Sequence, residues 1–143
     1  MVFRGLFGLL VWSKPEGAEK MSKDLKQLLN AAADALNARR LCRGHMALGL
    51  AKPPKPGSKP KLGEVYPWDV AKLHEVAEVS LLGAIALAAE ATPDTEEVQQ
   101  AYMAVHRKLR DAGVPYTPET WNDQESRTKV EVVDILRTTA DGF

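Results

Sequence analysis

The sequence predicts an all-α fold, a compact bundle of about four helices with a Pro/Lys-rich loop and room for a minor extended pair. Apolar residues recur every three or four positions along several stretches, which is the period of one helix face. Threonine-led helix start signals follow at Thr92, Thr117 and Thr128. No convincing run alternates apolar with polar residues, the pattern of a half-buried strand, so no larger sheet is predicted.

The composition indicates one ordinary globular domain. The 143 residues are 45% hydrophobic and 27% charged, with 19 basic and 19 acidic side chains. We expect residues 1–21 to be an apolar N-terminal extension and residues 22–143 to form a single helical domain. Cys42 is the only cysteine, so no internal disulfide can form and a cytoplasmic location is expected.

The N-terminal extension contains an apolar stretch, Val2–Trp12, whose 11 residues are too few for a membrane-spanning helix, which needs about 20. Two interpretations stay open. Either the stretch packs onto the domain or a partner, or it lies upstream of an original start at Met21. In the first case the candidate partner-binding residues are Phe3, Leu6, Phe7, Leu10 and Trp12.

The first helix is predicted over Lys23–Arg39. Its apolar positions share one face and comprise Leu25, Leu28, Leu29, Ala32 and Leu36. Residues 46–51 fit an extended or a helical conformation, and the pattern does not decide between them. Residues 52–66 hold four prolines among lysines. Because proline at that density disfavours both helix and sheet ladders, a semi-extended basic loop is predicted there.

The second helix, expected to be central and buried, is predicted from Asp69, as N-cap, to about Ala91. Trp68 and Leu73 would form a hydrophobic staple across its start. Its second half is apolar on nearly every side, which predicts burial. Gly83 lowers the helix propensity of this half, and a close crossing of another helix would explain its presence.

Three later elements are predicted from local start signals. Residues 92–113 form a helix that a Thr-Pro pair begins, and a second such pair begins a short turn at residues 117–121. A capping box of Thr128 and Glu131 starts the last helix, residues 128–140. The expected core positions of the two long helices are Val98, Ala101, Tyr102, Val105, Leu109, Val132, Ile135, Leu136 and Thr139.

Charge is distributed unevenly along the chain. Residues 1–66 carry 12 basic and 5 acidic side chains, whereas residues 67–143 carry 7 basic and 14 acidic ones. Neutralisation of one half by the other is the simpler interpretation, and attraction of an anionic partner is the alternative. The candidate nucleic-acid-binding residues are Arg39, Arg40, Arg43, Lys52, Lys55, Lys59 and Lys61.

Residue types that carry out catalysis or bind metals do not form a convincing constellation. Cys42 and His45 make only half of a metal site, because zinc takes three or four ligands. His74 and Glu78 have a chelating spacing that is also common on a solvated helix face. Ser80 lacks the sharp turn that exposes a serine nucleophile. We therefore expect no metal, no cofactor and no enzymatic activity.

The C-terminal third carries a family resemblance. The motif Trp-Asn-Asp at residues 121–123, followed by Arg-Thr at 127–128 and Glu-Val at 131–132, resembles the signature of an uncharacterised family of small proteins from actinobacteria and their phages. Residues 28–45 and 79–85 are similar to two further segments of that family, in the same order. The resemblance implies a compact helical domain of unknown function and supplies no catalytic residue. Serine at position 80, where the family is expected to have cysteine, argues against essential thiol chemistry.

The signature residues Trp121, Asn122, Asp123 and Arg127 have two interpretations. The favoured one is a structural latch on the last helix, in which polar side chains accept backbone N–H groups above a buried ring. The alternative is a binding pocket for a carboxylate or phosphate. We expect a non-enzymatic interaction protein, a phage accessory factor that binds a host or phage protein or self-associates. Nucleic-acid binding through residues 39–61 is the alternative function.

Overall fold

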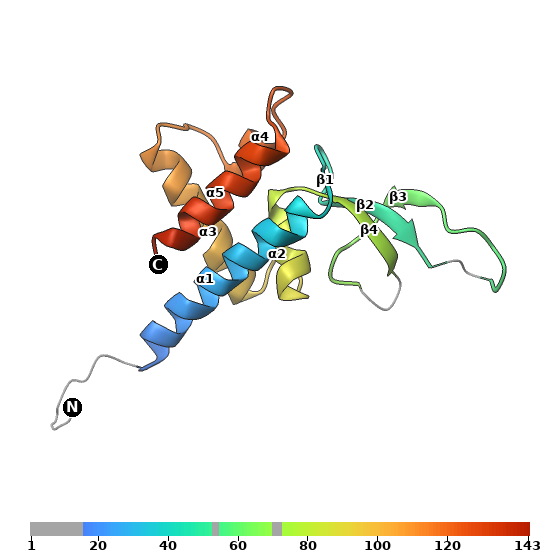
Figure 1. Ribbon diagram of the computed structural model, residues 1–143, viewed down its shortest axis with the longest axis horizontal. Helices are drawn as coiled ribbons and strands as arrows, with labels where there is room; N and C mark the ends of the chain where they lie inside the picture. Colours follow the sequence, from blue (N-terminus) through green and yellow to red (C-terminus); the bar gives the residue numbers. More distant parts are fainter. Residues whose placement is uncertain (1–15, 53–54, 70–72) are drawn as a thin grey trace, which may run out of the picture.

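A computed structural model describes residues 16–52, 55–69 and 73–143 of the chain. In chain order its elements are α1 (Glu16–Asn37), β1 (Arg40–Leu41), β2 (Ala47–Ala51), β3 (Leu62–Glu64), β4 (Leu73–Val79), α2 (Leu81–Ala89), α3 (Glu96–Asp111), α4 (Pro118–Asn122) and α5 (Lys129–Asp141). The prediction of an all-α bundle is therefore wrong, because a four-stranded sheet accompanies the helices. Figure 1 shows the helices gathered into one body and the hairpin of β2 and β3 projecting away from it.

The helices with strong local signals form close to their predicted positions. α1 buries all five of its predicted core residues, although it begins at Glu16, seven residues before the predicted Lys23. α5 begins at the predicted capping box of Thr128 and Glu131. In α4 the side chain of Thr117 accepts the backbone N–H of Thr120, as expected of an N-cap. α3 begins one turn later than predicted, with Thr95 as its N-cap.

The predicted helix over residues 69–91 is wrong in its first half. Residues 73–79 form strand β4, and α2 begins after Ser80, whose side chain caps it in place of Asp69. Val76 and Val79 are both buried although they lie three positions apart, a spacing typical of a helix. The register of β4 against β2 skips Ala77, so a bulge resets the alternation and puts both valines in the core.

The sheet has the strand order β1-β4-β2-β3. β1 runs parallel to β4, and β2 runs antiparallel to both of its neighbours. The undecided residues 46–51 thus contain a strand, and the segment predicted to be wholly loop, residues 52–66, contains β3. Every residue of β3 is exposed, and Pro56 and Pro60 precede it, so neither proline interrupts its ladder.

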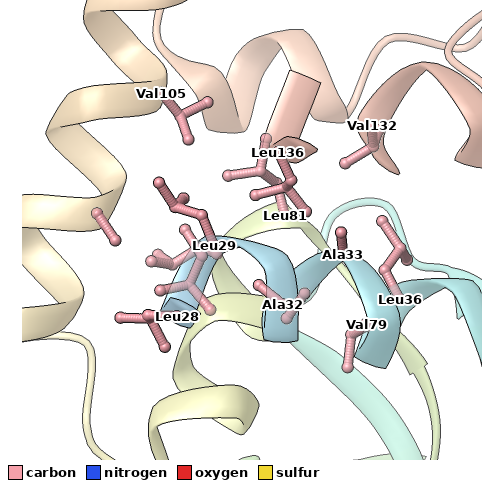
Figure 2. Close-up of a cluster of buried hydrophobic side chains, with 14 of the residues drawn as sticks. Leu28, Leu29, Ala32, Ala33, Leu36, Val79, Leu81, Val105, Val132 and Leu136 are labelled. Carbon is pink, nitrogen blue, oxygen red and sulfur yellow. The ribbon is translucent and has the colours of Figure 1, made fainter. Parts of the chain in front are cut away.

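The core forms where α1 meets α2, α3, α5 and the end of β4. Figure 2 shows Leu29 and Leu36 of α1 close to Val79, Leu81 and Leu136, and all five side chains are fully buried. Because α1 packs against α2, α3 and α5, it is the central helix, a place that the sequence assigned to the second helix. The sheet contributes Val76 and Val79 of β4 to this core, and α2 contributes Leu81 and Ile85.

Gly83 explains how closely α2 approaches the sheet. A Cβ atom at this position would collide with the carbonyl oxygen of Met46, just before β2. The expected close crossing is therefore with an extended backbone and not with another helix. The same carbonyl accepts the N–H of Ser80 at 2.9 Å, so the first turn of α2 is pinned to the start of β2.

Candidate functional site

Asn122 connects three separate parts of the chain through its amide group. Its Oδ1 accepts the N–H of Leu81, the first residue of α2, at 3.0 Å, and its Nδ2 donates to the carbonyl of Cys42 at 3.0 Å. The same Nδ2 lies 3.0 Å from Oδ1 of Asp123. Asn122 is 1% exposed, so these protein groups replace the water that its amide would otherwise bind.

Asp123 and Arg43 form a junction between the turn after β1 and the end of α4. Oδ1 of Asp123 accepts the N–H of Gly44 at 3.0 Å, and Gly44 has a positive φ of 78° that suits a glycine in a turn. Arg43 donates to the carbonyl of Gln124 at 3.2 Å and to that of Arg127. The turn after β1 is therefore tied to the end of α4 by hydrogen bonds in both directions.

Arg127 lies over the ring of Trp121, with its guanidinium carbon 3.9 Å from the ring centroid. Its Nε donates to the Trp121 carbonyl at 3.0 Å. Its two terminal nitrogens donate to Gln124 at 2.6 Å and to Glu131 at 2.7 Å. Each nitrogen of the guanidinium thus has a partner within the protein, so three of its five N–H donors are engaged.

The four predicted signature residues are therefore brought together, and each makes contacts to other parts of the protein. This arrangement favours the latch interpretation, which stays a prediction until the stability of a variant without the latch contacts is measured. The hydrogen-bonded assembly of Trp121, Asn122, Asp123 and Arg127 is called the latch below.

A cavity of about 240 Å³ opens beside the latch, at the first turn of α2. Among the described residues, three carboxylate side chains line it, those of Glu64, Glu119 and Asp123, and no lysine or arginine does. An anionic ligand would meet these carboxylates, so the cavity does not suit the phosphate or carboxylate expected in the alternative interpretation. Its lining comprises Gly44, His45, Met46, Glu64, Tyr66, Ser80, Leu81, Leu82, Glu119, Asn122 and Asp123. Because these residues come from separate segments, no local motif signals the cavity.

Two side-chain pairs border this cavity. Nδ1 of His45 lies 3.4 Å from Oε2 of Glu64, and both side chains are about half exposed. The Tyr102 hydroxyl donates to Oε1 of Glu119 at 3.0 Å. Burial and this carboxylate raise the pKa of Tyr102 to about 12, so the hydroxyl keeps its proton at neutral pH and stays a donor.

The predicted basic cluster divides into two sets in the structure. Arg39 donates to the carbonyls of Ala35 and Val76 at 2.9 and 3.1 Å, and Arg43 holds the junction described above, so both guanidinium groups bind the protein itself. Arg40 is exposed in β1. The four lysines of the cluster are exposed and lie on the segment that joins β2 to β3, namely Lys52, Lys55, Lys59 and Lys61. We call residues 47–64 the basic arm (Figure 1).

An aromatic pair lies at the base of the basic arm. The rings of Tyr66 and Trp68 stack with centroids 5.0 Å apart and an interplanar angle of 28°. Tyr66 is 51% exposed, whereas Trp68 is half-buried. The predicted staple between Trp68 and Leu73 does not form around a helix start, because residues 73–79 are a strand.

Comparison with known families places the chain. A family model described as a family of unknown function (DUF6197) matches residues 21–142. The protein belongs to the DUF6197 family. The match includes the latch, the cavity and the basic arm, and it begins at Met21. No curated protein and no solved structure matches this DUF6197 chain.

The remaining predicted sites have these outcomes in the DUF6197 chain. His74 and Glu78 lie in β4 and do not share a helix face. Within the described ranges, no three His, Cys, Asp or Glu side chains are grouped so that they could hold a metal ion. Burial raises the pKa of the Cys42 thiol, which disfavours the thiolate that thiol chemistry requires. Among the described helices, none combines the length and apolar character that crossing a membrane requires.

The apolar partner-binding candidates Phe3, Leu6, Phe7, Leu10 and Trp12 lie outside the described residues.

Proposed function

We propose that this protein is a non-enzymatic interaction protein and that the basic arm is its binding element. Two features support the proposal. The amide of Asn122 and the guanidinium of Arg127 bind backbone groups of the protein itself, which favours a structural role for the latch. The arm, in contrast, extends from the body and presents its four lysine side chains to solvent.

Nucleic acid is the partner class that best fits the arm. The observation that carries this choice is that all four lysines of a projecting hairpin are exposed, while residues 51–63 contain no acidic side chain. A phosphate backbone offers a closely spaced row of negative charges, and lysines bind it by displacing its counterions.

A protein partner at the N-terminal extension is the second candidate function. It rests on six Phe, Leu and Trp side chains within residues 2–12, a density that a solvated tail does not need. The family resemblance supports an actinobacterial or phage source, and on that source the protein is an accessory factor acting in the host cytoplasm. A pull-down with the full chain and with a chain that starts at Met21 tests this candidate, since only the full chain would retain the partner.

Binding to labelled oligonucleotides tests the role of the basic arm. Fluorescence anisotropy at about 50 mM salt would compare the full chain with the variant Lys55→Glu/Lys59→Glu, using single strands and duplexes of about 20 nucleotides. The proposal predicts binding by the full chain and at least a tenfold weaker affinity in the variant.

The matched control is Lys26→Glu/Arg107→Glu, which makes the same change in net charge at exposed positions on α1 and α3. Equal losses in the two variants would mean that only net charge matters, and this would overturn the assignment to the arm. Absence of binding by the full chain at low salt would overturn the nucleic-acid proposal itself.

A further inference from the structure

We propose that the nucleic acid is single-stranded and that one of its bases stacks on Tyr66, an inference that rests on the proposed function of the basic arm. Among the described residues, Tyr66 is one of few large hydrophobic side chains with more than half of their surface exposed. Its ring is already stacked on Trp68, with centroids 5.0 Å apart. A base added to the free part of this ring would extend an existing aromatic stack.

The backbone around Tyr66 is fixed, which makes the ring a prepared platform. Just before it, Val65 is buried and donates its N–H to the carbonyl of Ala47 at 3.2 Å, continuing the pairing of β3 with β2. The Tyr66 carbonyl accepts the N–H of Asp69 at 2.9 Å, and Pro67 is fully buried. Because the platform is ordered before binding, little conformational entropy is lost when a base stacks on it.

The lysines lie close enough to Tyr66 for one strand of several nucleotides to contact both. An extended chain rises about 3.3 Å per residue, so the stretch from Lys61 to Tyr66 spans roughly 17 Å. Lys59 and Lys55 continue the basic surface beyond it. Leu62, which is 66% exposed, adds apolar surface between the charges and the ring. A strand of several nucleotides that follows the lysines therefore reaches Tyr66, and sites of about 4–16 nucleotides are usual for single-strand-binding modules.

The charges near Tyr66 determine which part of a nucleotide lies there. Tyr66 forms a wall of the cavity that Glu64, Glu119 and Asp123 also line. These carboxylates repel phosphate, so the backbone stays with the lysines and the uncharged base faces the ring. Bases within a duplex are stacked on one another and offer no free face, whereas a single strand does. The observations thus favour a single strand over a duplex.

The variant Tyr66→Ala tests this inference, with Tyr66→Phe as the conservative variant. The probes are fluorescein-labelled oligo(dT) of about 20 nucleotides and a duplex of the same length, measured by anisotropy at low salt with the full chain. We expect Tyr66→Ala to weaken single-strand binding about tenfold or more, and Tyr66→Phe to retain it. Duplex binding and the salt dependence of single-strand binding should be the same in both variants, because the lysines are unchanged. Phe143→Ala, at another exposed aromatic residue, is the matched control and should bind as the unaltered chain does.

Failure of this inference is distinguishable from failure of the proposed function. If the full chain binds single strands but Tyr66→Ala binds them equally well, stacking on Tyr66 is refuted and the arm keeps its role. If duplex is bound more tightly than single strand, the single-strand assignment is refuted. If neither probe binds, both proposals fail together. Circular dichroism of each variant checks that the fold is retained.

Discussion

Replacement of Asn122 by alanine is the sharpest test of the latch. It removes the acceptor of the Leu81 N–H and the donor to the Cys42 carbonyl, and Asn122 itself is 1% exposed. Leaving a buried polar group without a partner costs ~1–3 kcal/mol. Two such groups together cost about 2–6 kcal/mol, and water entering from the adjacent cavity offsets part of this cost, so we expect a loss of about 2–4 kcal/mol in the free energy of unfolding.

Urea denaturation followed by far-ultraviolet circular dichroism measures this loss. For a domain of this size the same loss lowers the melting temperature by about 6–15 °C. Asn37→Ala, at the exposed last residue of α1, is the control and should change the free energy of unfolding by less than about 0.5 kcal/mol. A cost below about 1 kcal/mol for Asn122→Ala would refute the reasoning, because the amide would then not hold its segments together.

Further predictions concern α2 and the capping box. Gly83→Ala places a Cβ against the Met46 carbonyl and should destabilise the protein by about 2 kcal/mol or more in urea denaturation. The control is Gly63→Ala, which has open space around it and should be nearly neutral. Equal effects of the two substitutions would contradict the close approach of α2 to Met46. Hydrogen bonds from the backbone and hydroxyl of Thr128, and then Arg127, hold the pKa of Glu131 below its ordinary 4.5. Because the folded-state pKa is lowered, the carboxylate stabilises the fold above about pH 4.5, and this contribution is lost as the pH falls through the folded-state pKa. Glu131→Gln should therefore lose less stability on acidification than the unaltered chain, and identical pH profiles of unfolding would refute this account.

The elements that sequence predicted well are those whose signals are local. The capping box of Thr128 and Glu131 and the N-cap of Thr117 involve groups three residues apart, so their hydrogen bonds are readable from the chain alone. The apolar face of α1 is similarly local, since one regular helix presents it. Prediction of these elements needed no knowledge of the tertiary structure.

The sheet could not be predicted because its signals depend on partners. Val76 and Val79 have the spacing of a helix, and only a bulge at Ala77 lets a strand bury them both. A bulge is defined by the pairing with a neighbouring strand, which the sequence of β4 does not show. β3 is wholly exposed and has no apolar pattern to detect. Gly83 did indicate a close approach, yet it could not indicate that a strand's backbone was the neighbour.

The candidate site shows the same limit. Sequence indicated that Asn122 could accept backbone N–H groups, but its partners lie 41 and 80 positions away, at Leu81 and Cys42. The basic cluster was visible as composition. Only the fold separates Arg39 and Arg43, which bind backbone carbonyls, from the lysines of the arm.

The dependence of nucleic-acid affinity on salt tests the central claim most directly. If the four lysines of the arm each neutralise a phosphate, the logarithm of the binding constant for a single strand should fall against the logarithm of salt concentration with a slope of about −3. Lys55→Glu/Lys59→Glu should reduce the magnitude of this slope by one or more, whereas Lys26→Glu/Arg107→Glu should leave it unchanged. Binding whose slope is the same in all three chains would contradict the account, and so would a full chain that binds no nucleic acid at low salt.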